Sequence, residues 1–234
     1  MSVDPMFGGD EALKTLIDGG HKRGIRIILD GVFNHVGDDS IYFDSGNKYG
    51  GALHNPSSPY REWFNISPDG GYECWWGVKN LPKVIKCDSF RSYICDTVIP
   101  KYMKMGIDGW RLDVVDEYPE SFLERITSAS KSIDRNAYIL GEVWEDASNK
   151  IAYGERKKYL CGNALDGVMN YPFRNAVCDF ITTSDNEFIT DITTTIAAHY
   201  PADRLNNSMN MLGTHDTERI LTVLGGIPSD GLSN

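Results

Sequence analysis

The segment Gly109-Trp110-Arg111-Leu112-Asp113 decides the fold, because an apolar strand core runs directly into a carboxylate and three other segments repeat that pattern. These are IRIILD at residues 25–30, which continues to Asn34 and His35, YILGE at 138–142, and MLGTHD at 211–216. Each predicts a short buried strand that ends on acidic or imidazole side chains. Successive parallel strands that present carboxylates at their ends are how a barrel enzyme builds its active site. Four such segments in order favour a hydrolytic pocket.

Helix-like stretches separate these segments. Asp10 can cap an amphipathic helix that stops at Gly24, and further helices are expected at 88–105, from Pro119 onward and at 186–199. Strands are expected at 25–29, 110–113, 137–142, 165–170 (ended by Pro172) and 209–212. Alternating strands and helices predict right-handed crossovers and a parallel sheet. Because only five such units are counted, the expected fold class is α/β, a partial TIM (β/α)8-type barrel.

Residues 36–87 differ in character from the rest. They are rich in Gly, Pro, Asn, Tyr and Trp and have no long hydrophobic period. We expect a small irregular domain here, inserted into a catalytic barrel formed by 1–35 and 88–234.

The bulk composition excludes several classes of partner. The 234 residues carry a formal net charge of -10, which disfavours nucleic acid and anionic membranes, and no apolar run is long enough to span a bilayer. The five cysteines are odd in number and form no Cys-x-x-Cys pair, so we expect reduced thiols and no zinc site. No signal-peptide pattern is visible in the first residues, and we expect a cytoplasmic protein.

The carboxylates supply what glycoside hydrolysis requires. A retaining enzyme needs two carboxylates about 5 to 5.5 Å apart, one to attack the sugar and one to move a proton. Asp113 and Glu142 end neighbouring strands, which lie about 4.8 Å apart in a sheet. Arg111 lies two residues before Asp113, so it points to the same side and can hold that carboxylate ionised. Asp216 adds a third carboxylate.

Four motifs resemble the signature regions of the α-amylase family of glycoside hydrolases, in the order in which that family carries them. They are Asp30-Gly31-Val32-Phe33-Asn34-His35, Gly109-Trp110-Arg111-Leu112-Asp113-Val114, Gly141-Glu142-Val143-Trp144 and Thr214-His215-Asp216-Thr217-Glu218-Arg219. The resemblance implies barrel strands three to about seven, with a small domain inserted after strand three. It also implies Asp113 as nucleophile, Glu142 as acid/base and Asp216 as transition-state stabiliser. Arg111, His35, His215 and Asp30 would surround or support the attacked sugar.

Two further segments resemble the neopullulanase, cyclomaltodextrinase and maltogenic amylase group. They are Cys74-Trp75-Trp76-Gly77 with Leu81-Pro82, and Met169-Asn170-Tyr171-Pro172-Phe173. That group cleaves cyclodextrins, pullulan and short maltodextrins, which are α-glucans of the starch type. Trp75, Trp76 and Tyr171 could stack on sugar rings, while the alternative for the tryptophans is packing of the inserted domain against the barrel. Linkage preference (α-1,4 or α-1,6) and ring or linear substrate stay open.

Three alternatives accompany this interpretation. The same residues could transfer a glycosyl group to another sugar, or the chain could bind α-glucan without turnover. Asn34 matches a position that binds calcium in many family members; we expect no metal or other cofactor, with calcium at Asn34 as the alternative. Open edges of a partial barrel would favour self-association.

Overall fold

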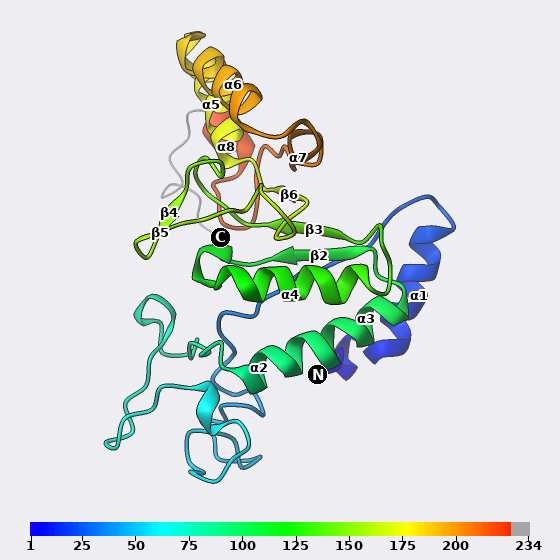
Figure 1. The fold of residues 1–234 in the computed structure, drawn as a ribbon, viewed down its shortest axis with the longest axis vertical. Coiled ribbons are helices and arrows are strands. Elements are labelled where there is room, and N and C mark those ends of the chain that lie inside the picture. The colour runs from blue at the N-terminus through cyan, green and yellow to red at the C-terminus, as the bar shows by residue number, and fades with distance from the viewer. Residues whose placement is uncertain (226–234) are drawn as a thin grey trace. The chain divides into compact units, whose positions relative to one another are not determined.

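A computed structural model describes residues 1–225, which divide into two units, Met1–Ile139 and Leu140–Asn234 (Figure 1). The first unit contains two parallel strands, the beginning of a third, and the helices that connect them. These elements are α1 (Gly9–His21), β1 (Ile28–Gly31), α2 (Asp88–Ser92), α3 (Ile99–Met105), β2 (Gly109–Leu112), α4 (Glu120–Lys131) and β3 (Tyr138–Gly141). The boundary between the two units falls within strand β3, between Ile139 and Leu140.

Strand β2 lies at the centre of the first unit. All four of its side chains are buried, as expected for a parallel strand covered on both faces. It pairs in parallel with β1, in a register that sets Asp30 opposite Arg111. On its other side the Tyr138 backbone N–H donates to the Asp108 carbonyl at 2.9 Å. A side chain at Gly109 would collide with the Tyr138 carbonyl oxygen, so this close approach requires glycine.

Strand β1 is shorter and more exposed than the sequence predicts. It begins at Ile28 rather than at residue 25, and the Ile28 side chain is 36% exposed. In the described chain β1 stands at the end of the strand order, so a neighbouring strand covers it on one side only. The apolar run predicts the strand correctly. The burial of its side chains depends in addition on how many strands lie beside it.

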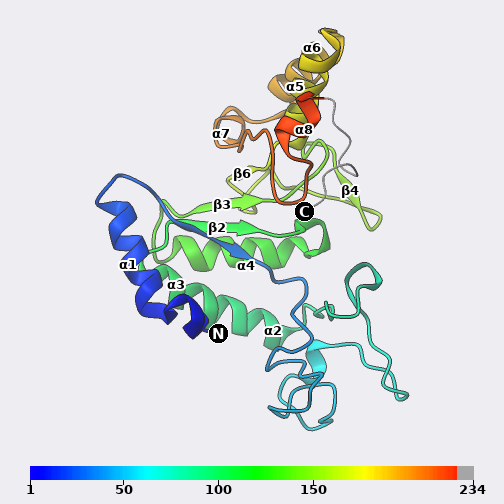
Figure 2. The ribbon, with the colours of Figure 1, turned by 180° about the vertical axis from the view of Figure 1, so that it is seen from behind.

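The helices of the first unit form close to where the sequence places them. Gly8, with φ +86°, is the N-cap of α1, whereas Asp10 lies in the first turn and pairs with Lys101 at 2.6 Å. The helix expected at 88–105 is helical throughout but passes through a π-helical turn at Tyr93–Val98. Pro100, which has no backbone N–H to donate, follows that turn directly. Figure 2 shows α4 along the strands, and its buried Phe122 and Ile126 each contribute about 2 kcal/mol of apolar burial.

Residues 36–87 contain no strand and no helix longer than a 3-10 turn in the described chain. Isolated antiparallel bridges, such as His35 with Lys83, hold this region together. Phe43, Trp63 and Phe64 form its buried aromatic core. Residues 36–87 are therefore irregular, and the interpretation that they form a domain inserted after strand three stays a prediction.

Within residues 140–225, the second unit contains short strands and four helices. They are the end of β3, β4 (Ile151–Ala152), β5 (Glu155–Arg156), β6 (Gly167–Val168), α5 (Tyr171–Thr183), α6 (Glu187–His199), α7 (Ala202–Asn206) and α8 (Ile220–Gly225). Strand β6 pairs in parallel with β3, with Leu140 opposite Gly167. Helices α5 and α6 pack against each other (Figure 1).

Two predictions in this unit were wrong. The strand expected at 209–212 is reduced to one parallel bridge between Met209 and Met169. The Leu212 carbonyl instead accepts a hydrogen bond from Arg174 Nε at 3.0 Å, which removes it from a strand ladder. Helix α5 was missed, because Pro172 was interpreted as the end of a strand. Pro172 in fact occupies the first turn of α5, and the Asn170 side chain caps that helix.

None of the helices within residues 1–225 has the length and apolarity needed to cross a membrane.

Candidate active site

Asp30, Arg111 and Asp113 form an ionic cluster at the ends of β1 and β2. Arg111 Nη1 donates to Asp30 Oδ1 at 2.8 Å and to Asp113 Oδ1 at 2.7 Å. The parallel register brings Asp30 opposite Arg111. Side chains along a strand alternate between its two faces, so Asp113, two residues after Arg111, lies on the same side as Arg111. The Arg111 and Asp113 side chains are largely buried, whereas that of Asp30 is half exposed. Arg111 thus forms ion pairs with both carboxylates.

Tyr118 fixes the backbone next to Asp30, and no pattern in the sequence predicts this role. Its hydroxyl accepts from the Phe33 backbone N–H at 3.0 Å and donates to the Gly31 carbonyl at 3.3 Å. Burial raises the pKa of the Tyr118 phenol well above its usual range, so it stays a neutral donor. The chain that leaves β1 is thereby fixed next to Asp30.

His35 and Trp75 lie together, as stacked rings with centroids 6.1 Å apart. Burial lowers the pKa of His35, and the positive charge of Lys86 lowers it further, so the neutral imidazole is favoured. Trp76 instead projects into solvent with 86% of its surface exposed, and its φ of +49° lies in the left-handed region. Such strain in a non-glycine residue is typical of functional sites. Of the two predicted stacking tryptophans, Trp76 is the one presented to solvent.

Asn34, the predicted alternative calcium ligand, is engaged by Lys86. Its Oδ1 accepts a hydrogen bond from the Lys86 ammonium at 2.6 Å, and Lys86 also donates to the Val84 carbonyl at 2.9 Å. A cation that binds this oxygen would have to displace the Lys86 amino group from it. No group of three or more His, Cys, Asp or Glu side chains within residues 1–225 is arranged to hold a metal ion.

Glu142 belongs to a second cluster, which lies in the second unit. The Trp144 indole Nε1 donates to Glu142 Oε1 at 2.9 Å, and the indole stacks on the Tyr171 ring with centroids 3.9 Å apart. The Tyr171 hydroxyl is 3.4 Å from Thr214 Oγ1. Tyr171 is fully buried, so the aromatic surface offered here to a sugar belongs to Trp144, which is 43% exposed. The two-residue spacing from Glu142 was the available signal for Trp144.

His215 and Asp216 form an exposed pair. They follow Thr214 directly in the sequence. His215 Nε2 lies 3.0 Å from Asp216 Oδ2, and the Asp216 backbone N–H donates to Thr214 Oγ1 at 3.2 Å. Asp216 therefore lies in a turn that follows the Met209 bridge, rather than at the end of a strand as predicted.

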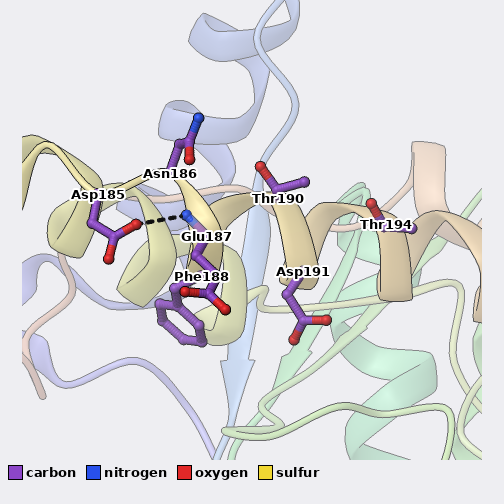
Figure 3. Close-up of a pocket in the computed structure, with 7 residues that line it drawn as sticks. All are labelled: Asp185, Asn186, Glu187, Phe188, Thr190, Asp191 and Thr194. Carbon is purple, nitrogen blue, oxygen red and sulfur yellow. Dashed lines mark hydrogen bonds between the residues drawn. The ribbon is translucent and has the colours of Figure 1, made fainter.

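The described chain also has a surface hollow of about 860 Å³ along the start of α6 (Figure 3). Its wall is contributed by residues 185–194, including Asp185, whose carboxylate accepts from the Glu187 backbone N–H at 2.9 Å. None of the predicted site residues lines this hollow.

Each unit contains parallel strands, and a carboxylate of its cluster lies at a strand end, which is the arrangement typical of barrel glycosidases. The α-amylase catalytic-domain family model matches residues 1–230. The chain therefore belongs to the α-amylase family, as the signature motifs predicted.

Relatives with established names fit the predicted subgroup. The chain is 36% identical to an amylopullulanase of Thermoanaerobacter thermohydrosulfuricus, over 99% of this chain and 18% of the relative. It is 36% identical to a cyclomaltodextrinase of Geobacillus thermopakistaniensis (96% and 37%) and 35% identical to neopullulanase 2 of Thermoactinomyces vulgaris (97% and 38%). The chain thus spans less than half the length of these curated relatives.

Solved structures confirm the fold. A cyclic α-maltosyl-(1→6)-maltose hydrolase from Arthrobacter globiformis matches with a TM-score of 0.82 and 30% identity, over 97% of this chain and 50% of that chain. A cyclomaltodextrinase matches with a TM-score of 0.82 and 34% identity, over 97% and 38%. The predicted fold class, a partial (β/α)8-type barrel, is confirmed.

Proposed function

We propose that this chain carries catalytic residues of a retaining α-glucan hydrolase. The observation that carries the proposal is the Arg111 guanidinium shared between Asp30 and Asp113 at the strand ends of a chain from the α-amylase family. A nucleophilic carboxylate must stay ionised and correctly aimed, and one arginine bound to both carboxylates achieves this.

The reaction follows a double displacement. Glu142 gives its proton to the glycosidic oxygen while the Asp113 carboxylate attacks the anomeric carbon. The carbon–oxygen bond breaks, its electron pair stays on the leaving oxygen, and a β-glycosyl ester forms on Asp113. Glu142 then takes a proton from water, whose oxygen attacks the anomeric carbon and releases an α-configured sugar together with the free Asp113 carboxylate.

The remaining predicted residues bind the distorted sugar. Asp216, His215 and His35 contact its hydroxyls and bind it more strongly in the transition state, which lowers the barrier. The half-buried, neutral imidazole of His35 suits a hydrogen-bond donor without charge. Trp76 offers an exposed indole face to a sugar ring. The hydrogen bond from Lys86 to the Asn34 oxygen supports a site that works without calcium at Asn34.

The substrates are starch-type α-glucans. Relatives of the chain are named cyclomaltodextrinase, neopullulanase and amylopullulanase, and one solved neighbour is described in complex with cyclic α-maltosyl-(1→6)-maltose. Cyclodextrin, pullulan and maltotriose therefore form the first substrate panel.

The test is anomeric NMR of the products from these three substrates. We expect α-configured product from the unchanged chain and none from Asp113→Asn. A β-configured product would overturn the retaining mechanism, and absence of product from the folded chain with all three substrates would overturn the proposed activity. Stability in excess chelator, measured by thermal unfolding, tests the calcium statement: a fall in Tm would contradict it.

A further inference from the structure

Trp144 is the partner of Glu142 in the second unit. It lies two residues after Glu142, and its indole Nε1–H donates to Glu142 Oε1 at 2.9 Å. Glu142 is 4% exposed, so this contact forms where water has little access. A hydrogen bond to a group that can carry charge contributes more to stability than one between neutral groups.

The position of the indole is itself fixed by a chain of contacts. Its ring lies parallel to the Tyr171 ring, at 12° and 3.9 Å between centroids. Tyr171 is the first residue of α5, is fully buried, and has its hydroxyl 3.4 Å from Thr214 Oγ1. Helix α5 therefore orients Trp144 through the stack, and Trp144 orients the carboxyl group.

We propose that Trp144 is a positioning residue that determines which oxygen of Glu142 carries the transferable proton. This rests on the proposed function, in which Glu142 is the acid/base. An indole N–H donates and cannot accept. Its hydrogen bond is made best to a carbonyl-type oxygen, so Oε1 keeps that character when Glu142 is protonated and the proton resides on Oε2. Because the indole is neutral, it holds the carboxyl group in both protonation states.

The first test needs no turnover. The chain has five tryptophans, and the indole ¹⁵N–¹H resonance of Trp144 is the one that disappears in Trp144→Phe. We expect this resonance to move in Glu142→Ala and in the isosteric Glu142→Gln, and to stay in place in the neighbouring exposed variant Glu145→Gln. A Trp144 resonance that is unchanged in both folded Glu142 variants would overturn the proposal.

The second test separates positioning from sugar binding. Fluoride leaves without protonation, so α-maltosyl fluoride does not need the acid role of Glu142, whereas maltotriose does. In Trp144→Phe we expect kcat/KM for maltotriose to fall about tenfold, part of what a general acid contributes. We expect kcat/KM for the fluoride to change by less than about twofold. Equal losses on both substrates would assign Trp144 to sugar binding and overturn its positioning role.

The two proposals can fail separately. If the unchanged chain hydrolyses neither substrate, the proposed function fails while the indole resonance still decides whether Trp144 holds Glu142. If turnover is normal and the resonance does not respond to Glu142, the positioning proposal alone fails.

Discussion

Asp113 and Glu142 are held in opposite ways. Asp113 receives a guanidinium that it shares with Asp30, whereas Glu142 receives a neutral indole N–H that an aromatic stack keeps in place. A permanent cation suits a carboxylate that must remain ionised until it attacks. A neutral donor suits a carboxyl group that must gain and lose a proton in each cycle. The comparison teaches that the partner of each carboxyl group matches the charge changes that its role requires.

The largest effect is expected from removing the ionised carboxylate itself. Asp113→Asn keeps the size of the side chain but removes the nucleophile, so maltotriose hydrolysis should fall by about 10⁴-fold or more. Product formation at long incubation times measures this, with circular dichroism to establish the fold. If the variant kept a tenth of the activity, the assignment of the nucleophile and the whole comparison would be wrong.

The second-largest effect is expected from removing the cation that Asp30 and Asp113 share. In Arg111→Met, Asp30 and Asp113 lose their shared cation and face each other as like charges. We expect turnover to fall about 100-fold and the free energy of unfolding to fall by about 2 kcal/mol, measured in urea. Arg125→Met is the matched control, because Arg125 pairs with Asp96 at 2.8 Å on an exposed surface. It should change stability by less than about 1 kcal/mol. Equal losses of stability from the two substitutions would show that the ion pairs of Arg111 contribute no more than the exposed pair of Arg125.

The sequence predicted the parts of the site that depend on local spacing. Arg111 and Asp113 share one side of the chain because strand side chains have a period of two. The partner contacts depend on residues far apart in the chain, such as Trp144 with Tyr171 and Asn34 with Lys86. No periodicity signals those contacts.

The same distinction explains the errors in the fold. Strands at 110–113 and 137–142 were found from their apolar runs. The strand at 209–212 was lost because a side chain, that of Arg174, takes the carbonyl that a ladder would use. Helix α5 was missed because a proline can end a strand and begin a helix equally well.

A smaller effect is expected at Trp76, where strain and exposure occur together. In Trp76→Gly the left-handed φ of +49° suits glycine, so the free energy of unfolding should stay equal or rise by about 1 kcal/mol. Loss of the indole should raise KM for maltodextrins about fivefold if that face binds sugar. Trp76→Phe is the control that keeps a ring. A stabilised variant with unchanged KM would leave Trp76 without a substrate role.

The last prediction concerns the pH dependence of stability that arises from Lys86, the half-buried lysine that donates to Asn34. Burial, and then repulsion from Lys83, lowers the pKa of Lys86 to about 7. Between about pH 7 and the ordinary lysine value of 10.5 the folded chain therefore binds fewer protons than the unfolded chain. The free energy of unfolding should then rise with pH in this window, by at most about 1.4 kcal/mol per pH unit from this one group.

Urea unfolding of the unchanged chain and Lys86→Met at several pH values from 7 to 9.5 measures this slope. Lys86→Met should lose this contribution to the rise with pH, because it has no proton to release, whatever its absolute stability. Lys104→Met is the control, since Lys104 is an exposed lysine in the last turn of α3 and should keep the slope. A slope that survives in Lys86→Met would mean that another group titrates in this window. Lys86 would then stay protonated on the Asn34 oxygen throughout this window.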